Sequence, residues 1–381
     1  MTLITWLLAG FCLFVISSSL DALLGIRRLG RLVAAPPWEG VTPRVSIVVA
    51  GRNESRGIEA GMRSLLAQNY PALEIVAVND RSTDDTGAIL DRLAEGERSL
   101  RIVHLTELPA GWLGKNHALS LGAAAANGEW LLFTDADVVM RPDTLSRAIG
   151  HAERNHLDHL TVLPDLILPG LLSCFTAAFV VWFSCFVRPW KASDPKSRFS
   201  VGVGAFNLVR VSAYLRAGGH EPIRMRPDDD LKLGKILKQS GARSEAMSGR
   251  GMVSVEWYHS LGEAIDGLMK NTFSVVEYYS LLLFNGSLFY LLVGLGPLAM
   301  LLFGAGPIPW FGSLTIAGQL LVHSFAARET GAPWYAGAFY PLAAVLMAWI
   351  LIRALVLNLW QGGIVWRGTF YPLSELRRNR V

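Results

Sequence analysis

Long apolar runs occupy both ends of this chain. Near the N-terminus, residues Leu3 to Leu24 carry a single charged side chain, Asp21. A run of this length is sufficient to cross a bilayer as a helix. Arg27, Arg28 and Arg31 follow it directly, and such clusters are typical of the cytoplasmic end of a span. The pattern therefore predicts an uncleaved membrane anchor over residues 1–27, with its C-terminal end in the cytoplasm.

Three further apolar segments follow Asn271, at about residues 279–303, 310–327 and 334–352. They predict C-terminal membrane segments over residues 278–360, followed by a basic tail over 361–381. Three complete crossings would place Arg367 and the later arginines opposite the first span's cytoplasmic end, against the usual bias. The middle segment carries Gln319 and His323, and a re-entrant course for it is the alternative.

Between these ends, short β-branched runs alternate with amphipathic stretches. The runs at 45–50, 73–80, 101–105 and 130–134 predict strands, and the stretches at about 57–68, 86–93 and 114–126 predict helices. A further helix is expected over 230–239. This alternation indicates an α/β domain built on a doubly wound, Rossmann-like, mostly parallel sheet, flanked by transmembrane helices.

The stretch from Leu166 to Val187 contains no charged residue over 22 positions. If it crossed the membrane, the acidic residues before it and those after it would lie on opposite sides of the bilayer and could not share a site. We therefore expect a helix, broken near Pro169 and Gly170, that lies in the membrane interface. A helix buried in the protein core is the alternative.

The composition supports a membrane protein. Hydrophobic residues make up 51% of the 381 positions and charged residues only 17%, which is more apolar than a soluble protein needs. The formal charge is +4, and no basic tract resembles a nucleic-acid-binding arm. We therefore expect the lipid bilayer, and not a nucleic acid, as a partner.

Two acidic residues end the last predicted strand of this series. Asp135 and Asp137 follow the apolar run Trp130–Thr134 and are one residue apart, so their side chains point the same way on an extended backbone. Ligands of parallel sheets gather at this edge, and paired carboxylates suit Mg²⁺ or Mn²⁺ carrying a diphosphate. A solvated acidic turn is the competing interpretation.

Four motifs occur in an order that resembles family 2 glycosyltransferases of the GT-A fold, over residues 44–277. Within that family the chain looks most similar to membrane-bound enzymes that glycosylate lipids, such as ceramide glucosyltransferase, carotenoid glycosyltransferases and hopanoid-associated glycosyltransferases. The motifs are Arg52-Asn53-Glu54, Asn79 to Thr86, Leu108 to Leu119, and the Asp-x-Asp motif Asp135-Ala136-Asp137.

This resemblance implies a nucleotide-sugar site and a divalent metal, Mn²⁺ or Mg²⁺. Asp137 would hold the metal, and Asp135 would contact the ribose or the same ion. Asp80 can accept a hydrogen bond from the imide N–H of uracil, and Lys115 supplies a positive charge near the diphosphate. The donor-binding residues implied in this way are Ala50, Arg52, Asn53, Glu54, Asp80, Lys115, Asp135 and Lys270.

The run Asp228-Asp229-Asp230-Leu231-Lys232-Leu233-Gly234 resembles the family segment Glu-Asp-x-x-Leu-Gly, whose aspartate is the general base. Aligning Leu233 and Gly234 with Leu-Gly places the base at Asp230 and the preceding acid at Asp229. Adjacent carboxylates disfavour one another's ionisation, which raises at least one pKa towards a value useful for removing a hydroxyl proton. An acidic cap of the following helix is the competing interpretation.

The chain departs from the polymerising members of this family. Their Gln-x-x-Arg-Trp segment is not found, and in that region stand Glu256-Trp257-Tyr258-His259 and, further on, Lys270. Lys270 is therefore a candidate cation near the leaving group. His259 is a candidate third metal ligand, although a lone histidine beside aromatic residues is more often a packing residue.

These observations predict an inverting glycosyltransferase that moves a sugar from a nucleotide-sugar donor, expected to be a UDP-hexose, to a hydroxyl of a membrane lipid. The protein would cross a bacterial inner membrane several times with its catalytic domain in the cytoplasm. Two alternatives remain open on the sequence alone: a polysaccharide synthase of the same family, and a catalytically silent scaffold that binds nucleotide sugar.

Overall fold

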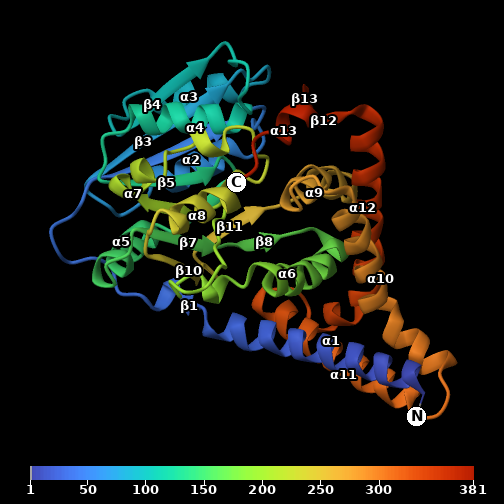
Figure 1. The fold of residues 1–381 in the computed structure, drawn as a ribbon. Helices are drawn as coiled ribbons and strands as arrows, with labels where there is room; N and C mark the ends of the chain where they lie inside the picture. Colours follow the sequence, from blue (N-terminus) through green and yellow to red (C-terminus); the bar gives the residue numbers. More distant parts are fainter. Residues whose placement is uncertain (1) are drawn as a thin grey trace.

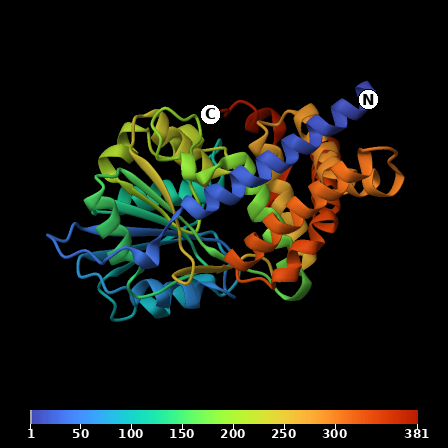
Figure 2. The ribbon, with the colours of Figure 1, turned by 90° about the horizontal axis from the view of Figure 1, so that it is seen from below.

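The computed structural model describes residues 2–381. A sheet covered by helices forms one part of the molecule, and long apolar helices form the other (Figure 1). Viewed from below, α1 (Leu3–Arg28) runs from the sheet across the group of apolar helices (Figure 2). Residues 30 and 31, one residue after this helix, form the edge strand β1, so a single residue joins α1 to the sheet.

The large sheet has eight strands and is mostly parallel, as the alternation of strands and helices predicts. Only β9 runs antiparallel to its neighbours β5 and β7. In spatial order the strands are β1 (Gly30–Arg31), β10 (Ser244–Ser248), β7 (His159–Leu163), β9 (Asn207–Arg210), β5 (Trp130–Asp135), β2 (Val45–Gly51), β3 (Leu73–Asp80) and β4 (Leu100–Leu105).

Helices bury both faces of this sheet, which explains why its central strands are apolar at almost every position. In β2, Ile47 and Val49 pack into the core formed with α2, α3 and α5, whereas Val48 packs against α4 and α8 on the other face. These helices are α2 (Ile58–Leu66), α3 (Thr86–Ala94), α4 (Gly114–Ala125), α5 (Thr144–Arg154) and α8 (Asp229–Gln239); α7 (Val211–Arg216) and the short turns η1 (Leu32–Ala34) and η4 (Glu221–Ile223) connect them.

A smaller sheet links the large one to the apolar helices. Its strands, in spatial order, are β6 (Val138–Met140), β11 (Val253–Glu256) and β8 (Asp165–Ile167). The helix expected from Leu166 in fact begins at Ser173, because Leu166 pairs with Val255 in this sheet. A turn, η2 (Gly170–Leu172), then leads into α6 (Ser173–Val187), which η3 (Pro189–Lys191) follows.

Four helical segments among residues 2–381 are long and apolar enough to cross a membrane: α1, residues 173–191, α10 (Ser280–Phe303) and residues 334–361. The last of these consists of η5 (Trp334–Phe339) and α12 (Tyr340–Gln361). The expected middle segment is α11 (Ile308–Glu329), which packs against α1 and α10 and is not among the four. The amphipathic helix α9 (Leu261–Val275) joins the sheet region to this bundle.

The C-terminal residues, expected to form a basic tail, instead form a hairpin of β12 (Gly363–Trp366) and β13 (Thr369–Pro372), followed by α13 (Leu373–Leu376). The hairpin lies beside the loops at the sheet's edge (Figure 1). Arg367, at its tip, is therefore on the same side as the Asp-x-Asp motif. The chain consequently returns to the sheet domain after its last apolar helix.

Candidate active site

A polar cavity of about 250 Å³ opens at the carboxyl ends of β2, β3 and β5. The three strands lie side by side, and Ala50 is paired with both Val78 and Asp135, so the loops that follow them meet at one place. We call it the donor cavity. Ten of the residues predicted from the sequence line it: Ala50, Arg52, Glu54, Asp80, Lys115, Asp135, Asp137, Asp229, Asp230 and Lys270.

Two predicted residues lie outside the lining of this cavity as defined over residues 2–381. Asn53 joins two loops: its backbone N–H donates to Ser82 Oγ at 3.0 Å, and its side-chain oxygen accepts from the backbone N–H of Thr83 at 2.8 Å. His259 has its Nδ1 3.4 Å from a carboxylate oxygen of Glu256. Its role as a metal ligand stays a prediction.

Asp135 and Asp137 both line the donor cavity, although β5 ends at Asp135 and Asp137 lies in the turn that follows, not on the extended backbone expected from the sequence. Lys115, at the start of α4, places its Nζ 2.8 Å from Asp135 and 3.4 Å from Asp229. Burial alone would lower the pKa of Lys115, but these carboxylates outweigh it and raise that pKa. In Asp137, burial and the nearby charges of Asp135 and Glu54 raise the pKa to about 7. Asp137 therefore lies where an additional positive charge would be favourable.

The lining residues fit a divalent cation. Six carboxylates and four cationic side chains line the cavity, which leaves two negative charges when all of them are ionised. Within residues 2–381, no three Asp, Glu, His or Cys side chains are gathered into a ready-made metal site. A cation bound by Asp137 and Asp135 would therefore complete its coordination with water and phosphate oxygens, as Mg²⁺ commonly does.

Asp80 lies at the end of β3 and is almost completely buried. Both of its oxygens accept hydrogen bonds from the guanidinium of Arg81, at 2.7 and 3.1 Å. Each carboxylate oxygen has two lone pairs, so Asp80 retains the capacity to accept one more N–H from a ligand. A Cβ at Gly114 would lie 2.3 Å from the Asp80 carboxylate, so the close approach of α4 requires glycine at this position.

The three adjacent aspartates at the start of α8 have different surroundings. Asp228 is bound on both oxygens by Arg226, which leaves Asp229 and Asp230 as the interacting pair. Asp229 approaches Lys115, whereas Asp230 accepts from the backbone N–H of Gly204 at 2.9 Å. Burial, and then the charge of Asp229, raise the pKa of Asp230 to about 7. A carboxylate with this pKa can remove a proton near neutral pH.

Gly204 lies between the carboxylates of Asp135 and Asp230. Its N–H donates to Asp230, and a Cβ on it would lie 2.5 Å from Asp135 Oδ2. Any larger residue would therefore push Asp135 or Asp230 out of position. The sequence analysis assigned no role to Gly204.

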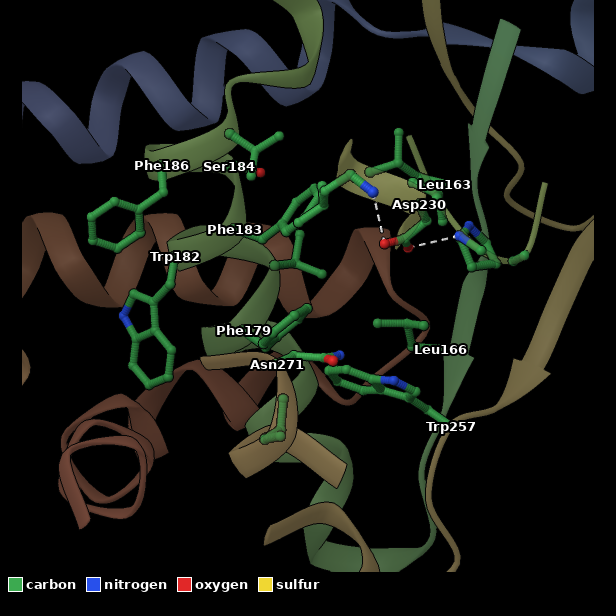
Figure 3. Close-up of a pocket in the computed structure, with 18 of the residues that line it drawn as sticks. Leu163, Leu166, Phe179, Trp182, Phe183, Ser184, Phe186, Asp230, Trp257 and Asn271 are labelled. Atoms are coloured by element: carbon green, nitrogen blue, oxygen red, sulfur yellow. Dashed lines mark hydrogen bonds between the residues drawn. The ribbon is translucent and has the colours of Figure 1, made fainter. Parts of the chain in front are cut away.

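A second cavity, of about 1000 Å³, begins at the same acids and extends between the apolar helices. Four aromatic side chains of α6 form one wall of it, and together they make a row that leads away from Asp230 (Figure 3): Phe179, Trp182, Phe183 and Phe186. We call it the apolar cavity. The residues that line both cavities are Asp135, Asp137, Asp230, Trp257 and Asn271. Asp230 is thus accessible from a polar cavity and from an apolar one.

Arg226 fixes the start of α8. It is fully buried, and besides Asp228 it binds Glu277 at 2.8 Å and the backbone carbonyl of Ser274 at 2.7 Å, both near the end of α9. Removing one partner of a buried ion pair leaves the other charges uncompensated. The side chain of Arg226 therefore holds the acids of α8 against α9.

We expect Arg226→Met to lower the free energy of unfolding by about 3–5 kcal/mol. Arg224→Met is the matched control, because Arg224 forms an exposed pair with Glu221, and such pairs contribute about 1 kcal/mol or less. Chemical unfolding of both variants in detergent, followed by tryptophan fluorescence, measures the difference. Equal stability of the two variants would contradict the structural role of Arg226.

The structure also brings residues to the site that the sequence analysis missed. Trp366, Arg367 and Tyr371 of the C-terminal hairpin line the donor cavity together with Trp257 and Tyr258. A signal for the hairpin exists, since two β-rich runs flank the pair Arg367-Gly368. Nothing in the sequence, however, indicates which part of the molecule the hairpin contacts.

Comparison with known proteins agrees with this geometry. The model of the family described as glycosyl transferase family 2 matches residues 46–210, which include the Asp-x-Asp motif and the loops after β2 and β3. The chain carries a family 2 glycosyltransferase domain. Asp229, Asp230 and the C-terminal hairpin lie beyond the matched residues.

Two curated proteins illustrate the similarity of this glycosyltransferase domain. The chain is 22% identical over 223 residues to 4,4'-diaponeurosporenoate glycosyltransferase of Staphylococcus haemolyticus, which covers 58% of each protein. It is 31% identical over 150 residues to beta-monoglucosyldiacylglycerol synthase of Trichormus variabilis, which covers 38% of this chain and 32% of that protein. The chain thus spans less than two thirds of the length of each of these relatives.

One solved structure is similar over most of its length. The mannosyltransferase PcManGT from Pyrobaculum calidifontis, in complex with GDP-Man and Mn²⁺, superposes with a TM-score of 0.54 at 20% identity, covering 93% of this chain and 99% of that one. This likeness confirms the expected GT-A fold.

Proposed function

We propose that this protein transfers a sugar from a nucleotide-sugar donor, a UDP-hexose being the donor expected from Asp80, to a hydroxyl of a membrane lipid. The observation that carries the proposal is the position of Asp230, which lines both the donor cavity and the apolar cavity. The lipid-modifying names of two relatives, the carotenoid enzyme and the glycolipid synthase, support the same acceptor class.

In this proposal each part of the reaction has its own residues. Lys115 and Lys270 bind the diphosphate, Asp80 binds the base, and the aromatic wall of α6 holds the lipid chain. Asp230 accepts the proton of the lipid hydroxyl as its oxygen attacks the anomeric carbon in line, and the bond from that carbon to the diphosphate breaks with inversion. A divalent cation on Asp137 and Asp135 would stabilise the negative charge on the departing diphosphate, and the PcManGT complex contains Mn²⁺.

The test is to incubate membranes containing the protein with a panel of radiolabelled nucleotide sugars and then to extract the lipids. We expect label from one donor in the organic phase, and less of it by a factor on the order of 10² or more from membranes that contain the Asp230→Asn variant. Label in water-soluble polymer would indicate a polysaccharide synthase instead. Binding of donor without any transfer would indicate a silent scaffold.

A further inference from the structure

The tip of the C-terminal hairpin has an unusual backbone. Arg367 and Gly368 form the two-residue turn between β12 and β13, and both have positive φ, +47° and +78°. Hairpin turns of this kind favour glycine and asparagine, because a residue with a Cβ is strained in the left-handed region by about 1–2 kcal/mol. An arginine at such a position points to a function for its side chain.

The hairpin binds the loop that follows β2. The guanidinium of Arg367 donates to the backbone carbonyl of Arg52 and pairs with the carboxylate of Glu54. In return, Arg52 Nη1 lies 3.4 Å from the hydroxyl of Thr369. At its other end the hairpin places Tyr371 in the lining that also contains Asp80. Its residues therefore border the donor cavity at both the base-binding loop and the metal-binding acids.

Three cationic groups at this side of the cavity lack a full set of partners. The ammonium of Lys270 lies 4.4 Å from the ring centre of Trp366, and burial together with the charges of Lys115 and Arg367 lowers the pKa of Lys270 to about 8. Arg52 Nε is buried without a hydrogen-bond acceptor. Arg367 has one acidic partner, Glu54, which is also close enough to Asp137 to raise the pKa of that residue. A multiply charged anion would satisfy all three groups.

We propose that the hairpin is a strap over the donor, and that Arg367 binds the diphosphate of the nucleotide together with Lys270 and Arg52. Glu54 holds the guanidinium in place before the donor arrives. When the diphosphate occupies the cavity, its oxygens replace Glu54 as partners of Arg367, and the fork of the guanidinium suits two of those oxygens. This inference rests on the proposed nucleotide-sugar donor and adds a donor-binding residue from beyond the last apolar helix.

The test compares equilibrium binding of nucleoside diphosphates and monophosphates to the purified full-length protein with Mn²⁺ present. UDP, UMP, GDP and GMP are the probes. Arg367→Gln should weaken binding of the diphosphate by a factor on the order of 10 to 100, while leaving the monophosphate nearly unchanged. Arg367→Lys should retain part of the diphosphate affinity, because it keeps the charge without the fork.

Arg378→Gln is the matched control, since Arg378 is an exposed arginine of the same C-terminal segment. It should bind every probe as the unaltered protein does. If the Arg367→Gln variant bound nucleoside diphosphates as tightly as the unaltered protein does, the proposed strap would be wrong, but the proposed donor class would stand. If the variant lost affinity for diphosphates and monophosphates by the same factor, the strap would also be wrong, because the hairpin would then only shape the loop after β2. If the unaltered protein bound no nucleoside diphosphate, both the strap and the proposed donor class would be wrong.

Discussion

Replacing Asp230 with asparagine should lower sugar transfer by a factor on the order of 10² or more, while binding of donor and metal persists. Asparagine has nearly the same size and can still accept a hydrogen bond from Gly204, but it cannot take up a proton. The loss should therefore appear in kcat and not in the affinity for nucleotide. Steady-state kinetics with lipid acceptor, combined with nucleotide binding, measures both quantities.

Asp229→Asn is the control for this prediction, because Asp229 approaches Lys115 and does not line the apolar cavity. It should weaken activity less, through the local charge. An inactive Asp229→Asn variant beside a nearly normal Asp230→Asn variant would place the base one residue earlier. Near-normal transfer by both variants and by the double variant would show that the cluster serves only as a helix cap.

The assignment of Asp230 as the general base also predicts how sugar transfer depends on pH. Burial and the charge of Asp229 raise the pKa of Asp230 to about 7, and a base must be unprotonated to act. Activity should therefore be highest above pH 7 and fall as the pH decreases through 7, with a limiting slope of about tenfold per pH unit. This acidic limb should be absent from the residual activity of Asp230→Asn.

Replacing Asp137 with alanine should abolish transfer and metal-dependent nucleotide binding, and leave the protein folded. Asp137 lies at a loop end, and burial together with Asp135 and Glu54 raises its pKa to about 7, so removing its carboxylate relieves repulsion within the apo protein. The thermal midpoint without ligand should not decrease. Titration of nucleoside diphosphate with and without Mn²⁺ measures the loss of binding.

Asp143→Ala serves as the control for Asp137→Ala, since Asp143 precedes α5 and pairs with Arg147 outside the donor cavity. It should retain metal-dependent binding. Undiminished transfer by the unaltered protein after removal of all divalent metal would refute the metal assignment.

The sequence predicted the sheet domain well because its signals are local. A strand buried on both faces must be apolar along its length, and β2, β3 and β5 begin and end within about a residue of their predicted limits. The loops that follow these strands meet because the strands are parallel neighbours. The assignment of Glu54, Asp80 and Asp137 to one site came from the resemblance to family 2 glycosyltransferases, and the parallel strands place these three residues in one cavity.

Contacts between segments that are distant along the chain could not be predicted from the sequence. Leu166 is apolar in a helix or in a strand alike, and only its pairing with Val255 decides the matter. In the sequence, Arg226 is indistinguishable from an exposed charged residue. One of the acidic partners that compensate its buried charge is Glu277, 51 positions away. Arg367 looked like part of a basic tail because no local pattern reveals the loop that it contacts.

We propose that a lipid reaches Asp230 through the apolar cavity, and a matched pair of variants on α10 tests this route most directly. Gly286 lines that cavity, whereas Gly296 does not, and a Cβ at either position meets its nearest side chain at 3.7 Å. The measurement is the rate of label transfer into lipid at saturating donor. We predict that Gly286→Phe lowers this rate by at least about tenfold with donor binding intact, and that Gly296→Phe leaves it unchanged. Equal rates for the two variants would contradict the claim.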